Sequence, residues 1–473
     1  MKGVRRMTGR VRRSWLLLTA LSVAAGMSAV APAVAIETLS EAMVSAYMEN
    51  PTLRAARARQ RASDEIVPQA KSGWRPTITA NAQASIQIQN DNHFKGSLFS
   101  PPNNDVTNTV PGQFEIVLSQ PIFDGFDTKY RVKSGEATVE AGRQDLLATE
   151  QNVLFDVTQA YMDVIQGRQV VALRERNVVV LREQLRAAQE RFNVGEVTRT
   201  DVAQARSRVA EAQSLVADAK SFLASSIAAF INVVGHSPGP LKYPKIAKLP
   251  PSLDAAIELA ERINPSVLAA AFVAEAARHD INVARSGLLP DVSVQASVSR
   301  QYPDLQEKPN TDTYALFGVV SIPLYESGRV YSEVRQAKQT ASQRRIQIIE
   351  TARAVREEVA SSWSALLSAR LKITAAKTQV AAAQLALEGV KQEYLVGSRT
   401  TLDVLNAESE VLTARETLVD GEHDQVVAAY RLIAATGRLT AADLGLGTVP
   451  YDPVENYRNV RNKWFGTHAD TVD

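Results

Sequence analysis

The sequence predicts an exported, mainly α-helical protein that also carries four β-strands suited to a membrane β-barrel. Three observations indicate this fold class: an N-terminal leader, an internal duplication, and, in each half, alternating strand-like segments followed by very long proline-free helices. Helical segments of some 66 residues would span roughly 100 Å. That length is too great for a compact domain.

Residues 1–35 have the order of a secretory signal peptide. Six basic and no acidic residues precede an apolar run from Trp15 to Ala25, and small residues follow up to Ala35. We expect cleavage after Ala35. The remaining chain has 47 Lys and Arg against 51 Asp and Glu, a net charge of about −4, because the leader holds six of the 53 basic residues. Basic and acidic residues alternate along helical faces, so we expect no nucleic-acid partner.

The composition argues against an enzyme. The absence of cysteine excludes disulfides, thiolate metal sites and N-terminal lipid attachment. The five histidines, at 93, 236, 279, 423 and 468, lack metal-ligand spacing, and no phosphate-binding Gly loop or Gly-x-Ser-x-Gly motif occurs. We therefore expect no catalytic residue, metal or cofactor. After the leader there is no run of about 18 apolar residues, which predicts no transmembrane helix.

The chain is duplicated, with one gap between its halves. Asn50-Pro51 recurs as Asn264-Pro265 at an offset of 214, and later motifs recur at an offset of 202. A 12-residue insertion between Pro76 and Pro121 accounts for the difference. We assign residues 36–252 to the first repeat, 253–440 to the second, and 441–473 to a C-terminal equatorial segment or tail.

Each repeat begins with a helical stretch, at about 39–71 and 253–285, which leads to two predicted strands. The strands lie at about 77–90 and 113–123 in the first repeat, and at about 291–301 and 313–325 in the second. Apolar Ile78 and Ala80 alternate with polar Thr79 and Asn81. A half-buried sheet of a soluble protein would show the same alternation.

Three features favour a barrel in lipid. The strands run about 10 residues or more, and each has a proline at its helix-side end: Pro76, Pro121, Pro290 and Pro323. Aromatic residues gather at one rim (Trp74, Phe123, Tyr325) and at the other (Phe94, Phe99, Tyr302, Tyr314). Four strands cannot close a barrel, and an open edge is not tolerated in hydrocarbon. The chain must therefore oligomerise.

Each repeat continues into a long helical hairpin, at 127–235 and 328–436. Apolar residues near the far end follow a heptad seam: Val178, Leu181, Leu185, Ala188 and Phe192, matched by Val380, Ala383, Leu387, Val390 and Tyr394. The turns contain Val194-Gly195 and Val396-Gly397, with glycine suited to a positive φ. Thr198 with Asp201, and Thr400 with Asp403, resemble capping boxes that open the return helices.

Together these features resemble the TolC family of outer-membrane efflux and type I secretion ducts, over about residues 37 to 440. The resemblance implies a homotrimer with a 12-stranded barrel in the outer membrane of a Gram-negative bacterium and a periplasmic helical tunnel. It also implies an equatorial region from Pro238 to Leu253 and the C-terminal tail. A periplasmic adaptor and an inner-membrane transporter would be its partners, and drugs or secreted proteins its cargo.

The resemblance also implies a gate at the periplasmic tip. Tyr394 would hydrogen-bond Asp201 within a subunit, and Arg399 would reach Thr200 and Asp201 of a neighbour. Asp403 matches one of the family's two carboxylate rings, and Asn406 stands where the second would be. The alternative for Asp201 and Asp403 is a capping role alone. By resemblance, the adaptor would dock at the tips, around Val194, Gly195, Val396 and Gly397.

A secreted coiled-coil adhesin or structural protein is the competing hypothesis. It would share the leader and the heptads. It does not explain the strands with proline joints or the two-fold repeat.

Overall fold

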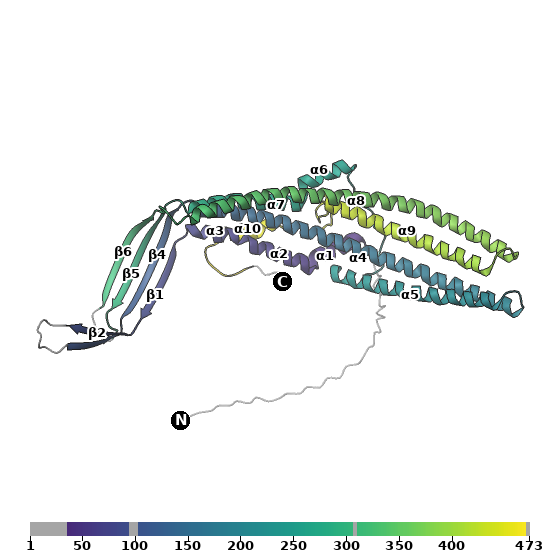
Figure 1. Cartoon of the computed structure of the whole chain (residues 1–473), viewed down its shortest axis with the longest axis horizontal. Coiled ribbons are helices and arrows are strands. Elements are labelled where there is room, and N and C mark those ends of the chain that lie inside the picture. The colour runs from purple at the N-terminus through teal and green to yellow at the C-terminus, as the bar shows by residue number, and fades with distance from the viewer. Residues whose placement is uncertain (1–35, 94–102, 306–309, 470–473) are drawn as a thin grey trace, which may run out of the picture.

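The structure, a computed structural model, describes residues 36–93, 103–305 and 310–469. The expected signal peptide, Phe94 and Phe99 of the rim, and residues 470–473 of the tail lie outside these ranges. The described chain is mostly helical with few strands, which confirms the predicted fold class. Figure 1 shows an elongated molecule with a sheet at one end and two helical hairpin tips at the other.

Helices form most of the molecule. Their bounds are α1 (Leu39–Glu49), α2 (Pro51–Asp64), α3 (Ile66–Lys71), the 3-10 turn η1 (Ser72–Trp74), α4 (Asp127–Asn193), α5 (Arg199–Val234), α6 (Leu253–Ile263), α7 (Pro265–Ser286), α8 (Arg329–Leu395), α9 (Thr401–Ala435) and α10 (Pro453–Val460). The helices α4 and α8 have 67 residues each, about 100 Å at 1.5 Å per residue. The return helices α5 and α9 pair with their distal halves, and shorter helices, α1 to α3 and α7, pack beside the rest (Figure 1).

The repeated Asn-Pro motif joins the shorter helices end to end. Asn50 caps α2 and Asn264 caps α7, each followed by a proline in the first turn. The Asn50 Nδ2 donates to the Val233 carbonyl (2.9 Å), and the Asn264 Nδ2 donates to the Ala435 carbonyl (2.9 Å). Each asparagine side chain thus has two roles: its oxygen caps the start of the following helix, α2 or α7, and its NH₂ group binds a carbonyl at the end of a return helix, α5 or α9. In both repeats the pair packs against the long helix of its own repeat.

One described helix, α5, is long and apolar enough to cross a membrane by length and composition. The sequence predicted no such helix, because interspersed small and polar residues interrupt its apolar runs. A single helix of this kind is weak evidence for a membrane span. In this fold α5 packs along α4 in the first hairpin.

The strands are β1 (Thr77–Ala84), β2 (Gln87–His93), β3 (Asn103–Thr109), β4 (Gly112–Asp124), β5 (Asp291–Tyr302) and β6 (Thr311–Ser321). An antiparallel sheet has the order β1-β4-β5-β6. Its register places Ala80 opposite Ile116, Ile116 opposite Val298, and Val298 opposite Tyr314. One face of the sheet is therefore apolar across all four strands. Large side chains on this face are exposed in the single chain, for example Leu316 at 76%.

The strands differ from the expected ones in three places. The first strand ends at Ala84, and β2 pairs with β3 in a separate two-stranded ribbon that includes the region of the insertion. Pro121 lies inside β4, where the register shifts between Pro121 and Phe123. A bulge tolerates a residue without an N–H. The last strand ends at Ser321, two residues before Pro323.

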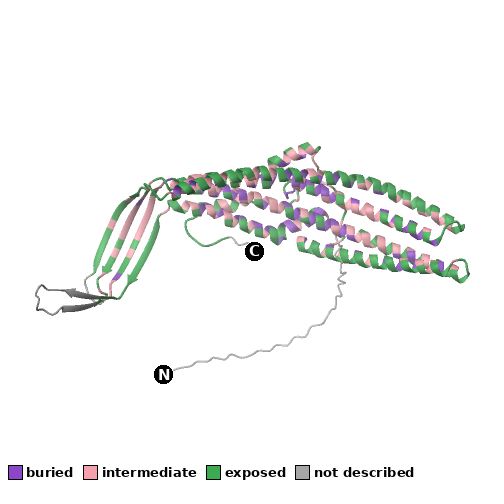
Figure 2. Cartoon of the chain, in the orientation of Figure 1, coloured by how far each residue is buried: buried purple, intermediate pink, exposed green. Residues whose placement is uncertain are grey.

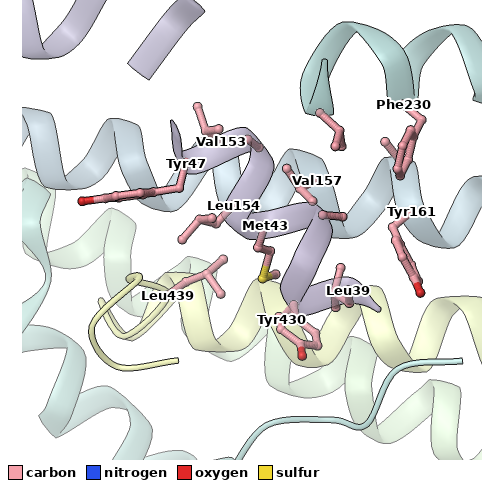
Figure 3. Close-up of a cluster of buried hydrophobic side chains, with 14 of the residues drawn as sticks. Leu39, Met43, Tyr47, Val153, Leu154, Val157, Tyr161, Phe230, Tyr430 and Leu439 are labelled. Carbon is pink, nitrogen blue, oxygen red and sulfur yellow. The ribbon is translucent and has the colours of Figure 1, made fainter. Parts of the chain in front are cut away.

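The main hydrophobic core lies near the middle of α4, where α1, α4, α5, α9 and the segment after α9 meet (Figures 2 and 3). Tyr161 is fully buried there, and its single O–H lies within hydrogen-bonding distance of the carbonyl oxygens of Lys242 (2.6 Å) and Glu37 (2.9 Å). Leu439 and Ala441, which follow α9 in the chain, also join this core. The tail beyond Pro453 differs from the expectation, because α10 leaves this region and packs on α2 and α4 toward the sheet.

Candidate functional site at the hairpin tips

Both hairpins turn through a glycine in the left-handed region. Gly195 has φ +84° and Gly397 has φ +81°. The Gly195 N–H donates to the Phe192 carbonyl (3.0 Å), and the Gly397 N–H donates to the Tyr394 carbonyl (3.1 Å). Positive φ is readily adopted only by glycine, which is why each long helix ends there. The exposed Val194 and Val396, at 72% and 81%, project at the two tips.

The return helices α5 and α9 begin with complete capping boxes. The Thr198 N–H donates to Asp201 Oδ2 (2.9 Å), and the Asp201 N–H donates to Thr198 Oγ1 (3.3 Å). Thr400 and Asp403 repeat this arrangement at 2.8 and 3.3 Å. Hydrogen bonds from Thr400 hold the pKa of Asp403 below its ordinary value. Both aspartates therefore have the capping role that the sequence offered as the alternative.

The tyrosine and arginine expected at the gate have partners within the second hairpin. The Tyr394 hydroxyl lies 3.3 Å from Thr401 Oγ1, and the Arg399 Nε donates to Glu393 Oε2 (2.7 Å). Among the described residues Tyr394 does not contact Asp201, its expected partner within the subunit. The expected partners of Arg399, Thr200 and Asp201, belong to a neighbouring subunit.

Two contacts instead cross between the hairpins. The Arg191 guanidinium of α4 lies over the Tyr394 ring, 4.6 Å from its centre, in a cation–π contact. On the return helices, the Arg208 Nη2 donates to Asn406 Oδ1 (3.2 Å). Leu405 of α9 is buried in an apolar cluster with residues of α4 and α5. The two hairpins therefore contact each other near their tips within one subunit.

The sequence alone missed Arg191 and Arg208 as site residues. The signal for them is present in the duplication, because Arg191 aligns with Glu393 and Arg208 with Glu410 at the offset of 202. At these two positions the first half has a basic residue and the second half an acidic one. Such reversals mark residues whose environments differ between the halves, and both arginines contact the other hairpin.

The described residues contain no cluster of three or more His, Asp or Glu side chains that could hold a metal ion. Among them the site is built from helix ends, exposed turns and contacts between hairpins. A sheet with one exposed apolar face stands at the opposite end of the molecule. This combination defines the class of outer-membrane channel proteins with a long helical extension.

The chain belongs to the outer membrane efflux protein family, whose model matches residues 43–236 and 256–438. It is 40% identical over 432 residues to the outer membrane efflux protein BepC of Brucella suis, covering 91% of this chain and 92% of that protein. It is 26% identical over 435 residues to the outer membrane protein TolC of Escherichia coli, covering 86% and 84%.

Solved structures share the fold. The CmeC outer membrane channel of Campylobacter jejuni has a TM-score of 0.75 at 17% identity, covering 90% of this chain and 89% of that one. The CusC structure has a TM-score of 0.73 at 19% identity, covering 84% and 91%. The protein is an outer-membrane efflux protein located in the outer membrane. The adhesin hypothesis is therefore abandoned.

Proposed function

We propose that three copies of this chain form an exit duct that passes small toxic molecules across the outer membrane, with a periplasmic adaptor and an inner-membrane transporter. The observation that carries the proposal is the four-stranded sheet, with its exposed apolar face and with β1 and β6 as its edge strands. An edge strand in hydrocarbon must find a partner. Pairing β1 of one subunit with β6 of the next closes a barrel of twelve strands from three subunits.

The long helices support the same assembly. Large apolar side chains along α8 are exposed in the single chain, including Ile346 (62%), Leu371 (64%) and Leu385 (76%). The seam residues of the first hairpin are largely buried, whereas those of the second are only partly covered. An uncovered apolar face on this scale marks a contact with another chain. In a ring of three, α8 of one subunit packs against the neighbouring subunit.

Small molecules are the favoured cargo, because the relative with 40% identity is named an efflux protein. Secretion of proteins is the second candidate, since the alkaline protease secretion protein AprF of Pseudomonas aeruginosa is 25% identical over 343 residues. Deleting the gene and measuring drug susceptibility and dye accumulation tests the first. Secreted protease activity in the same strain tests the second.

The partners are tested on the same trimer. We expect unheated samples in detergent to migrate as a trimer that heating converts to monomer, and crosslinked trimers to co-purify with an adaptor. The tips around Val194, Gly195, Val396 and Gly397 are the proposed docking site. A monomer before heating, in outer-membrane fractions that contain the protein, would refute the assembly.

We infer that the tips close the duct, with Thr200, Asp201, Tyr394 and Arg399 as the latch and Asp403 at the constriction. Replacing Tyr394 by Phe and Arg399 by Ser removes one hydroxyl and one charge from the tip. We expect a larger single-channel conductance in planar bilayers. An unchanged conductance, from a trimer of normal yield, would exclude these residues as the latch.

A further inference from the structure

The segment after α10 is tied to the base of the sheet. The Lys71 Nζ donates to Asn462 Oδ1 (2.9 Å), and an Arg75 guanidinium N–H donates to the Lys463 carbonyl (2.9 Å). The Arg75 guanidinium also lies over the Trp464 ring, 4.7 Å from its centre. Arg75 is two residues before the start of β1. The tail from Arg461 to Phe465 therefore lies beside the point where the chain enters the sheet.

This tail and the adjoining turn carry excess positive charge. The Arg461 Nη2 donates to Glu136 Oε1 (2.9 Å), which neutralises one of the four cations. The hydrogen bonds of the other three end on neutral oxygens: Lys71 on Asn462, Arg75 on a carbonyl, and Lys463 on the His468 carbonyl (2.7 Å). Burial, with the charges of Arg461 and Arg75, holds the pKa of Lys71 below its ordinary value against the opposing effect of Glu136. The cluster consequently favours an anionic partner.

Exposed aromatic side chains stand among these cations. Phe465 is 86% exposed, Trp464 is 58% exposed, and Trp74 of η1 is 49% exposed. Tryptophan is enriched at the boundary between a bilayer and water, because its ring is apolar with one polar N–H. The apolar face of β1 begins at Ile78, four residues after Trp74. The aromatic group thus continues the apolar surface of the sheet on its helical side.

We propose that Arg461–Phe465, together with Lys71, Trp74 and Arg75, forms a contact surface for anionic phospholipid headgroups of the periplasmic leaflet. The basic side chains bind headgroup phosphates, and Trp464 and Phe465 insert at the level of the headgroups. The surface fixes the depth of the duct in the membrane at the joint between sheet and helices. It rests on the outer-membrane location and is independent of the cargo and of the gate.

Trp464 itself reports on this contact. The chain has four tryptophans, of which Trp15 lies in the leader. Replacing Trp74 and Trp363 by Phe leaves Trp464 as the fluorophore of the mature trimer. The matched control replaces Trp74 and Trp464 by Phe and leaves Trp363 of α8, which packs against an apolar cluster that includes Ala256 of α6 and Leu432 of α9. Both trimers are reconstituted in vesicles of acyl-brominated phosphatidylcholine, alone or in an equimolar mixture with acyl-brominated phosphatidylglycerol.

We expect bromine to quench Trp464 and to leave Trp363 bright, with stronger quenching of Trp464 in the anionic vesicles. Adding Lys71→Gln and Lys463→Gln should reduce the quenching in anionic vesicles by about half or more, with the trimer intact. Emission of Trp464 that is equal in brominated and ordinary lipid would overturn the proposal. Shielding of Trp464 from aqueous iodide in detergent and in lipid alike would assign this surface to the neighbouring subunit instead.

Discussion

Asn406 occupies the position at which the family resemblance implies a second ring of carboxylates, and its amide oxygen accepts a hydrogen bond from Arg208. An aspartate there would keep this contact in charge-assisted form. In a trimer, Asn406→Asp adds three carboxylates one helical turn from Asp403. We expect a higher preference for cations over anions, measured as a shift in reversal potential under a salt gradient.

The matched control for this change is Asn406→Gln, which keeps an amide and adds no charge. Its reversal potential should equal that of the unmodified trimer. If the aspartate variant also leaves the potential unchanged, the side chain at 406 does not face the conduction path.

The glycines of the tips should be sensitive to a single methyl group. Nothing lies within 4 Å of a Cβ added at Gly397, yet its φ is +81°. Gly397→Ala should therefore destabilise the tip by about 1 kcal/mol through the backbone alone. The control is Gly389→Ala, because Gly389 lies inside α8 with equally open space and no positive φ. Hydrogen exchange at the tip should accelerate about fivefold in the first variant and not in the second.

At the scale of elements, the long helices are tied across the repeat by polar contacts that the sequence does not reveal. His423 of α9 lies with Nε2 2.8 Å from Asp163 of α4, and with Nδ1 3.2 Å from Asp424. Asp424 also pairs with Lys372 of α8 (3.1 Å). In the sequence His423 was only one of five scattered histidines. Its partner Asp163 lies 260 residues earlier in the chain, and no local sequence pattern connects the two residues.

This tie should depend on pH. Burial opposes the charged imidazole, but hydrogen bonds to Asp163 and Asp424 outweigh it and raise the pKa of His423 above 6.5. A histidine pKa raised by folding adds stability that is complete below the unfolded pKa. The added stability disappears as pH rises through the folded value.

We therefore expect the midpoint temperature of thermal unfolding of the trimer to decrease as the pH is raised from slightly acidic to slightly alkaline. A hydrogen bond to a charged group contributes roughly 1.5–3 kcal/mol, and burial of the imidazole offsets part of this contribution. His423→Gln should remove most of this dependence, whereas replacing the exposed His236, which pairs weakly with Glu37 (3.5 Å), should preserve it. A midpoint with the same pH dependence in the His423 variant would contradict the tie.

At the scale of the whole molecule, periodicity and duplication were sufficient to predict which segments form helices and which form strands. Burial of one face of an element leaves a repeating pattern of apolar residues in the sequence. Residues 78–84 alternate along one strand, and the register of the sheet extends the apolar face to β6. The break after Ala84 could not be predicted, because the alternation continues through Ile86 and Ile88 into β2. The cross-hairpin contacts of Arg191 and Arg208 depend on how the helices pack in space.

The apolar face of the sheet is the feature on which the assembly depends most directly. Leu316 of β6 lies on that face, opposite Ala296, and the adjacent Ala315 lies on the other face, opposite Ser297. Leu316→Arg places a charge toward hydrocarbon, at roughly 2–4 kcal/mol near the bilayer midplane. We expect much less heat-modifiable trimer in outer-membrane fractions.

Ala315→Arg is the matched control at the same depth, since it directs the same side chain into the lumen of the proposed barrel. Trimer yield should stay close to normal, and only conductance and ion selectivity should change. Equal losses in the two variants would mean that both faces of β6 are packed against protein. The twelve-stranded barrel would then be replaced by a sheet buried between subunits.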